Sequence, residues 1–325
     1  MKKYKIIIIL FIATIFIIGI GLNYLRFLKN PNPRLLPLDS KLPTNEIVFT
    51  PLGENAMPMG WIGFMNLDGT GIEMRSYEVP THLFMEVIPI KTYEQSLGRI
   101  FTWSFDGESV GGIFPVGPTN GQGYPVVMHM DGSISYCNPD ESIIAQDRVL
   151  VLSNTEVLAI EESFDNKNQR LVEFNMKTCQ INKTLYIPQG NETLQNFSFS
   201  KNGWLAIQFG SALYWQRDPL NTDFVGIRIY DPTMNIVNVI KNATLPSLSS
   251  DGRFIAYVNE TGEICVTEVD MLNPKCSGYT QHGISWSPDQ QWLVYSTLMA
   301  EITLRNIASG EETIIGYGVY PNWRP

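Results

Sequence analysis

A short pattern of apolar and polar positions recurs along this chain: an apolar strand, a tight polar turn and a second apolar strand. The clearest copy is residues 284–297, ISWSPDQQWLVYST, with its turn at Pro288 and Asp289. Proline fixes its own φ and aspartate can bond its own backbone, so this pair favours a turn. The β-branched and aromatic residues on either side favour strands. The segment is predicted to form a β-hairpin.

Related segments occur five more times, and the last one stops where its turn would begin. They read FTWSFDGESV at 101–110, LVLSN at 150–154, NFSFSKNG at 196–203, PSLSSDG at 246–252 and YPNWRP at 320–325. The large apolar residues that anchor the six copies are 49, 47, 49, 38 and 37 positions apart, namely Trp103, Leu152, Phe199, Leu248, Trp286 and Trp323. A repeat of this length is typical of a four-stranded propeller blade.

Each leading strand is expected to be followed by three more strands of the same blade. The second strands, such as FIAYV and WLVYS, are nearly continuously apolar, as expected when neighbouring blades cover both faces. The expected strands are 46–50, 61–66 and 72–77 in blade one, 109–114, 124–130 and 133–137 in blade two, 157–160, 170–175 and 181–187 in blade three, 204–209, 224–230 and 236–240 in blade four, 254–258, 263–269 and 275–280 in blade five, and 292–296, 301–307 and 312–316 in blade six.

The first blade begins without a leading strand, whereas residues 320–325 form a leading strand without a blade. If the end of the chain supplies the inner strand of the first blade, the ring closes and an aggregation-prone edge disappears. The predicted fold class is therefore all-β, a six-bladed β-propeller of four-stranded blades closed by the C-terminal strand.

These segments resemble the repeat of TolB-like β-propellers, which are relatives of the WD40 repeat. The resemblance rests on the WSPDG-like turns, on the strand 262–269, and on MNLDGTG at 65–71, which is similar to a strand–turn element of that family. It covers residues 44–325. The resemblance implies a propeller fold without implying one function, because propellers carry many functions.

The N-terminus is predicted to be directed to a membrane. Lys2, Lys3 and Lys5 precede an apolar run at 6–22, whose length is near the lower limit for spanning a bilayer. The run is followed by neither a lipobox cysteine nor an Ala-x-Ala site, which favours an uncleaved signal anchor. A cleaved signal peptide, which would make the protein secreted, and a buried soluble helix are the alternatives. The propeller is expected outside the cytoplasm, in a periplasmic or extracellular position.

The proline-rich stretch 30–43 is predicted to be an extended linker. The expected organisation is a signal anchor or transmembrane helix at 1–29, this linker, and the propeller at 44–325. Residues 1–34 hold six Lys and Arg and no acid, so the remaining chain has 17 basic and 32 acidic residues and a net charge of −15. Such a surface argues against a nucleic acid partner, which needs basic groups.

The four cysteines are Cys137, Cys179, Cys265 and Cys276. Disulfides are expected in a domain outside the cytoplasm. Cys265 and Cys276 lie on either side of a predicted hairpin at equal distances from its tip, which favours a bridge, with two free thiols as the alternative. Cys137 and Cys179 are expected on the outer strands of successive blades, and this placement does not favour a bridge between them.

No catalytic signature is evident in the sequence. The chain has three histidines, His82, His129 and His282, and lacks the motifs of common hydrolases and phosphate-binding loops. His129 is expected to be an ordinary strand residue, whereas His82 and His282 lie in loops and could face the propeller funnel. The Asp-Gly pairs are expected to form hairpin turns rather than calcium loops. Neither a metal nor a cofactor is predicted.

A candidate binding surface follows from the loop lengths. The longest connections are 51–60, 78–98, 116–123 and 210–223, and all belong to one face, because loops between the middle strands share a side with loops between blades. The last of these carries Tyr214, Trp215, Arg217 and Asp218, side chains typical of recognition surfaces. The alternative is an added strand with Tyr214 and Trp215 packed on the blade.

These observations favour a membrane-anchored extracytoplasmic scaffold that binds a protein, peptide or glycan at the loop face. The alternatives are a secreted or surface enzyme, a hydrolase or lyase with its active site in the funnel, and a structural or sensory module. The scarcity of histidine favours the scaffold, and a cytoplasmic segment of about five residues leaves little room for signalling.

Overall fold

The computed structural model of the protein describes residues 34–37, 46–52, 61–76, 100–115, 122–137, 143–162, 169–190, 192–210, 225–270 and 273–325. The chain divides into two compact units, Met1–Arg34 and Leu35–Pro325, and the second contains the β-propeller. Its six blades are antiparallel and four-stranded, as the repeat predicts.

The first blade joins the two ends of the propeller sequence. Its order is β25-β2-β3-β4, with β1 beside β4 at the outer edge, for β25 (Val319–Trp323), β2 (Ile47–Thr50), β3 (Trp61–Met65), β4 (Glu73–Ser76) and β1 (Arg34–Pro37). Ile47 lies opposite Trp323, and Val48 opposite Asn322. The predicted closure by the C-terminal strand is therefore confirmed. The fifth strand, β1, falls within the stretch expected to be a linker.

Blades two and three share one continuous sheet, because β7 pairs with β9 at Gln122–Gln146 and Gly123–Ala145. Blade two consists of β5 (Thr102–Trp103), β6 (Ser109–Pro115), β7 (Gln122–His129) and β8 (Ile134–Tyr136). Blade three consists of β9 (Ala145–Ser153), β10 (Glu156–Glu162), β11 (Gln169–Asn175) and β12 (Gln180–Tyr186).

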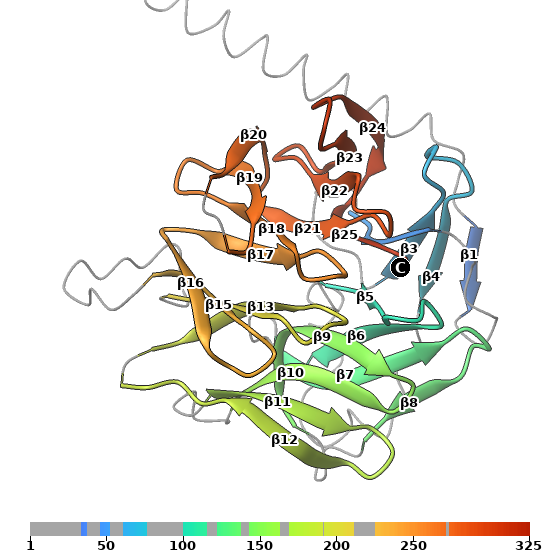
Figure 1. Ribbon diagram of the computed structural model, residues 1–325. Helices are drawn as coiled ribbons and strands as arrows, with labels where there is room; N and C mark the ends of the chain where they lie inside the picture. The colour runs from blue at the N-terminus through green and yellow to red at the C-terminus, as the bar shows by residue number, and fades with distance from the viewer. Residues whose placement is uncertain are drawn as a thin grey trace, which may run out of the picture. The chain divides into compact units, whose positions relative to one another are not determined.

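Blades four, five and six are separate four-stranded sheets. They consist of β13 (Leu194–Phe199), β14 (Leu205–Phe209), β15 (Gly226–Tyr230) and β16 (Ile236–Lys241); β17 (Thr244–Leu248), β18 (Phe254–Val258), β19 (Glu263–Glu268) and β20 (Lys275–Tyr279); and β21 (His282–Trp286), β22 (Trp292–Ser296), β23 (Glu301–Asn306) and β24 (Glu312–Tyr317). Figure 1 shows the leading strands, among them β17, β21 and β25, toward the middle, with β12, β16 and β20 outside.

The hydrophobic core lies between blades, so each blade is stabilised by its neighbours. Leu158 and Ile160 of blade three pack in one cluster with Phe197 and Phe209 of blade four. At the closure, Trp323 packs with residues of blades one and six, and 7% of its surface stays exposed. Burying each large apolar side chain contributes about 1.5–3 kcal/mol.

Buried serines brace the turns after three inner strands. The hydroxyls of Ser104, Ser249 and Ser287 donate to the carboxylates of Asp106, Asp251 and Asp289 at 2.5, 2.7 and 2.5 Å. Each serine also accepts the N–H of the residue five positions on, which starts or precedes the next strand. The residue after the aspartate is Gly107, Gly252 or Gln290, each with positive φ. The predicted turns are confirmed, and Gln290 occupies a conformation that glycine adopts more easily.

The Asp-Gly pairs at 68 and 131 also form turns. The Asp68 and Asp131 carboxylates accept hydrogen bonds from the backbone and hydroxyl of the residue two positions on, Thr70 or Ser133. These bonds lower the pKa of both carboxyls. Within the ranges that the structure describes, no cluster of His, Cys, Asp and Glu could hold a metal ion.

Both pairs of cysteines form disulfides. Cys265 and Cys276 are direct cross-strand partners in β19 and β20, and their Cα atoms are 4.0 Å apart. Cys137 is joined to Cys179, with Cα atoms 5.7 Å apart, which corrects the sequence-based expectation. Because blades two and three share a sheet and β8 is short, the turn that leads into β12 reaches the end of β8.

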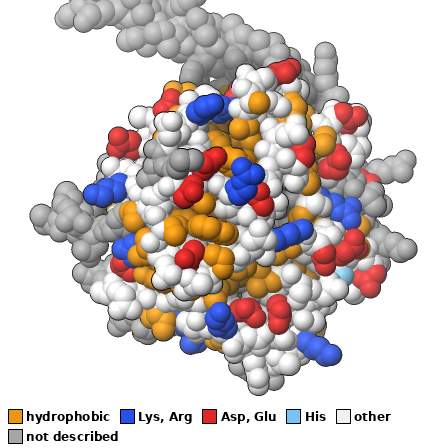
Figure 2. Space-filling model, in the orientation of Figure 1, with side chains coloured by type: hydrophobic (Ala, Val, Ile, Leu, Met, Phe, Trp, Pro, Cys, Tyr) orange, Lys and Arg blue, Asp and Glu red, His pale blue; other side chains and the backbone are white. Residues whose placement is uncertain are grey.

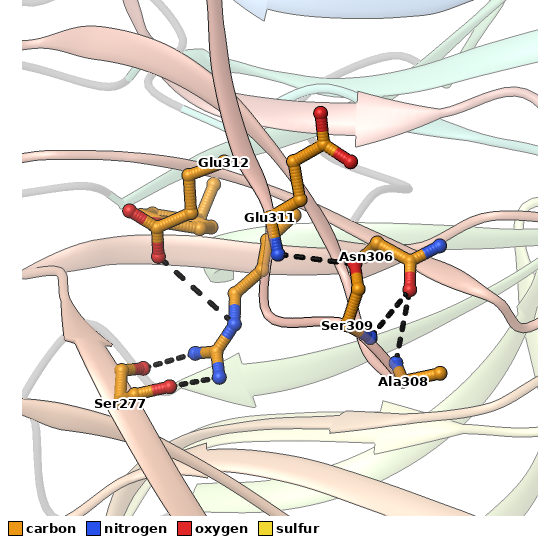
Figure 3. Close-up of polar contacts among 8 residues, drawn as sticks. Ser277, Asn306, Ala308, Ser309, Glu311 and Glu312 are labelled. Atoms are coloured by element: carbon orange, nitrogen blue, oxygen red, sulfur yellow. Dashed lines mark hydrogen bonds and ion pairs between the residues drawn. The ribbon is translucent and has the colours of Figure 1, made fainter.

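Polar contacts also join neighbouring blades at the outer rim. The Arg305 guanidinium of β23 donates to Ser277 of β20, through both the backbone carbonyl and the hydroxyl. Its Nε lies 4.0 Å from Glu312 Oε1, and Tyr295 OH donates to the same oxygen at 2.8 Å. Figure 3 shows Ser277 and Glu312 at the two ends of this set of contacts. Blades five and six are thus held together outside the apolar core as well.

Candidate functional site

The residues that the sequence favoured for binding lie outside the described part of the chain. Tyr214, Trp215, Arg217 and Asp218 fall within 211–224, and His82 falls within 77–99. Their roles stay predictions.

The other two histidines lie in strands. The ring nitrogens of His129 are 3.0 Å from Ser109 Oγ and 2.8 Å from Ser135 Oγ, which makes it a packed strand residue, as predicted. His282 begins β21 and packs edge-on against Tyr320, with ring centroids 5.3 Å apart. Burial lowers the pKa of His282. Neither histidine lines the central cavities of the propeller.

A ring of hydrogen bonds connects the inner strands of all six blades around the propeller axis. These strands do not pair with one another, so a side chain takes part in every contact. The six hydrogen bonds, each given as donor and then acceptor, are Trp103 N and Asn322 Oδ1 (2.9 Å), Thr102 Oγ1 and Val149 O, Arg148 Nη1 and Phe197 O (3.0 Å), Leu248 N and Ser198 Oγ (2.8 Å), Trp286 Nε1 and Ser247 O (2.8 Å), and Trp323 N and Ser285 Oγ (3.0 Å). The ring fixes the wall of a central channel.

Two cavities among the described residues lie along this channel. The larger, about 160 Å³, has Lys201, Ser287 and Pro288 in its wall, from the turns that follow the inner strands β13 and β21, and therefore lies toward the face that carries these turns. The smaller, about 20 Å³, is lined by residues near the opposite ends of the inner strands, among them Ile100 and Gly283. One water needs about 10–15 Å³, so only the larger cavity can hold a small organic molecule.

Arg148 of β9 lines both cavities. Its Nη1 donates to Phe197 O, while its buried Nε has no hydrogen-bond partner among the described residues. None of the described Asp and Glu side chains forms an ion pair with it. Burial lowers the pKa of Arg148 to about 10, so the guanidinium stays charged at neutral pH.

The side chains around Arg148 are neutral or basic. None of the described residues that line the two cavities is Asp or Glu, although the chain as a whole is acidic. The second cation, Lys201, lies near Asp106 at the turn face. Burial raises the pKa of the Asp106 carboxyl, but the Ser104 and Glu108 hydrogen bonds and the Lys201 charge outweigh it and lower the pKa. The interior of the channel therefore favours a negative group.

The face in Figure 2 carries hydrophobic side chains across its middle, interrupted by a few charged groups. A wider depression of about 690 Å³ adjoins the larger cavity, with which it shares Trp323. Trp292 and Leu304 are in its wall, and its charged groups are Glu46, Asp289 and Arg324. This depression has acidic residues in its wall, whereas the charged residues described in the wall of the channel are the basic Arg148 and Lys201.

Sequence reasoning did not single out Arg148 or Asn322. The available signal was a lone arginine within AQDRVLVLS, where a buried strand was expected to be apolar. The tilt of each blade decides which side chains of its inner strand face the propeller axis. The spacing of residues in the sequence does not give this tilt.

Among the residues that the structure describes, no helix is long and apolar enough to cross a membrane. The apolar run 6–22 lies outside those residues.

No family model and no curated protein matches the sequence. Several solved structures resemble the chain in three dimensions. The crystal structure of TolB from Acinetobacter baumannii is 14% identical, with 86% of this chain and 67% of that chain covered and a TM-score of 0.57.

Two other solved structures are less similar. The β-propeller domain of Myceliophteria thermophila Cps50 (Swd1) is 11% identical over 84% of this chain and 87% of that chain. PorZ of Porphyromonas gingivalis is 10% identical over 87% of this chain and 33% of that chain. Both have a TM-score of 0.45. At its 14% identity, the likeness to TolB concerns the fold alone, and it agrees with the six-bladed β-propeller that the repeat predicts and the strand order shows.

Proposed function

We propose that this chain is a membrane-anchored, extracytoplasmic scaffold that binds a protein, peptide or glycan on the loop face of its propeller. The membrane anchor is the apolar run at 6–22, preceded by three lysines. Two structural features support the other parts of the proposal.

The pairing of the cysteines supports a location outside the cytoplasm. All four cysteines of the chain form disulfides, Cys137–Cys179 and Cys265–Cys276. Structural disulfides persist in oxidising compartments and are rare in reducing ones. This observation carries the proposed location.

The difference between the two faces supports binding at the loops. On one face, the turns after the inner strands are short and braced by buried serines. The strand ends that flank the long connections 51–60, 78–98, 116–123 and 210–223 lie on the other face, because successive antiparallel strands end on alternate sides. Long loops on a rigid framework are the usual place of recognition.

Site-specific photo-crosslinking in cells that make the full-length protein tests this proposal. The crosslinking residue replaces Trp215 on the loop face or, as a matched control, Asn202, which is exposed in a turn on the opposite face. We expect a discrete crosslinked product in the membrane fraction from position 215 and none from position 202. Equal products from both positions, or none from position 215, would contradict binding at the loops.

A further inference from the structure

We propose that the central channel binds a carboxylate group through Arg148, Ser198 and Ser285. This site lies inside the ring of inner strands and is separate from the loop face, so it does not depend on the function proposed above.

The first argument is the charge of Arg148. Arg148 is partly buried, and a cation held away from water is costly unless it is paired and hydrogen-bonded. The guanidinium makes one hydrogen bond to Phe197 O, and its Nε–H has no acceptor among the described residues. Among the residues that the structure describes, no Asp or Glu lines either cavity. An anion that enters the channel would supply the missing negative charge next to this guanidinium.

Two hydroxyl groups in the same cavity add donors. Ser198 Oγ accepts the Leu248 N–H at 2.8 Å, and Ser285 Oγ accepts the Trp323 N–H at 3.0 Å. These bonds occupy oxygen lone pairs, so each hydroxyl proton is left to donate. Both serines line the larger cavity together with Arg148. Three donors from three blades thus surround one space.

The size and walls of the cavity favour a carboxylate over a larger or more highly charged anion. Lys201, the other cation in the wall, lies near Asp106, so the Arg148 guanidinium is left to balance one negative charge. Its fork of N–H groups matches the two oxygens of a carboxylate. The remaining wall contains Leu150, Ile284 and Trp286, which suit a short hydrocarbon portion. The carboxylate can come from a small organic acid or from the carboxyl end of a peptide.

The Arg148 Nε–H signal of the full-length protein, observed by NMR with arginine labelled with ¹⁵N, reports directly on this site. The signal is identified by its loss in Arg148→Lys. Butyrate is expected to shift it saturably, with a dissociation constant below about 1 mM, while butyramide leaves it in place. A Gly-Ser-Leu tripeptide with a free carboxyl end, compared with its amide, distinguishes a peptide source from a small acid. An unchanged signal with both carboxylates, or a shift by sulfate alone, would overturn the proposal.

Binding by the variants provides a second readout. Arg148→Gln is expected to weaken butyrate binding at least tenfold. Arg253→Gln, which removes an arginine stacked on Phe254 and not in the wall of either cavity, serves as the control and should bind normally. If Arg148→Gln does not fold, the response of the wild-type Arg148 Nε–H signal to butyrate still tests the proposal. Equal binding by both variants would show that the anion sits elsewhere.

Discussion

The Trp103 N–H donates a 2.9 Å hydrogen bond to Asn322 Oδ1, although the two residues are 219 positions apart in the sequence. Asn322 belongs to β25, which pairs with β2, while its neighbour Trp323 is bonded to Ser285 of blade six. The C-terminal strand therefore contacts the first, second and sixth blades at once. The stability of the ring should depend on these few residues.

Removing residues 320–325 is expected to destabilise the whole propeller. The truncation leaves β2 without its inner partner and removes the buried Trp323, whose loss alone should cost about 3–5 kcal/mol. Calorimetry of the truncated and intact proteins measures the effect. A melting temperature within a degree or two of the intact protein would show that the strand does not close the ring.

Asn322→Ala should destabilise the protein by about 1–3 kcal/mol, because the Trp103 N–H loses its acceptor in a part-buried position. The control is Asn202→Ala, which removes an exposed amide that donates to Asp251 O at 3.0 Å. That substitution should change the unfolding free energy by at most about 0.5 kcal/mol. Urea unfolding compares the two variants, and equal losses would mean that Asn322 has no special role.

Gln290→Gly should stabilise the last of the serine-braced turns. Gln290 has a φ of 61° where the equivalent turns carry glycine, and a left-handed conformation costs a non-glycine residue about 1–2 kcal/mol. Because glycine also loses more backbone entropy on folding, we expect a net gain of about 0.5–1 kcal/mol in the free energy of unfolding. Chemical denaturation measures it, and a loss of stability would show that the Gln290 side chain matters more than its backbone.

The protein should lose stability as the pH falls below about 6.5, through His282. Burial lowers the pKa of this histidine below its ordinary value of 6.5, so the unfolded chain binds a proton more readily. Its contribution is complete above pH 6.5 and is lost as the pH falls toward the folded pKa. His282→Phe, which keeps a ring against Tyr320, should flatten the pH dependence in this window. If the variant loses stability with falling pH as steeply as the wild-type protein, groups other than His282 cause the pH dependence.

Loss of the Cys137–Cys179 disulfide should destabilise the protein more than loss of Cys265–Cys276. The two bridges span 42 and 11 positions, for which chain entropy gives about 4 and about 3 kcal/mol. Double serine variants of each pair, unfolded in denaturant without reductant, provide the comparison. The reverse order would show that local packing, and not loop length, sets the effect.

Much of the fold could be predicted because propeller blades repeat a local pattern. FIAYV and WLVYS form strands with the predicted bounds, and the opposed positions of Cys265 and Cys276 follow from counting outward from a hairpin tip. Closure could be predicted because the first blade lacked a strand that residues 320–325 could supply.

The sequence pattern could not predict the contacts between blades. The Cys137–Cys179 bridge depends on blades two and three sharing a sheet, which involves two pairs of residues between β7 and β9. Similarly, Arg148 reaches Phe197 O across a blade boundary. Such contacts depend on how adjacent blades are tilted, whereas spacing along one strand reports only which residues share a face.

The pairing of Ile47 with Trp323 also has a consequence for biosynthesis. The ribosome makes β2 early, but its inner partner emerges only after the other blades have been synthesised. At about 5–20 residues per second, β2 waits on the order of tens of seconds with one edge unpaired. During that time the nascent chain exposes a site for pairing with other polypeptides, so a holding chaperone would act on the beginning of the propeller.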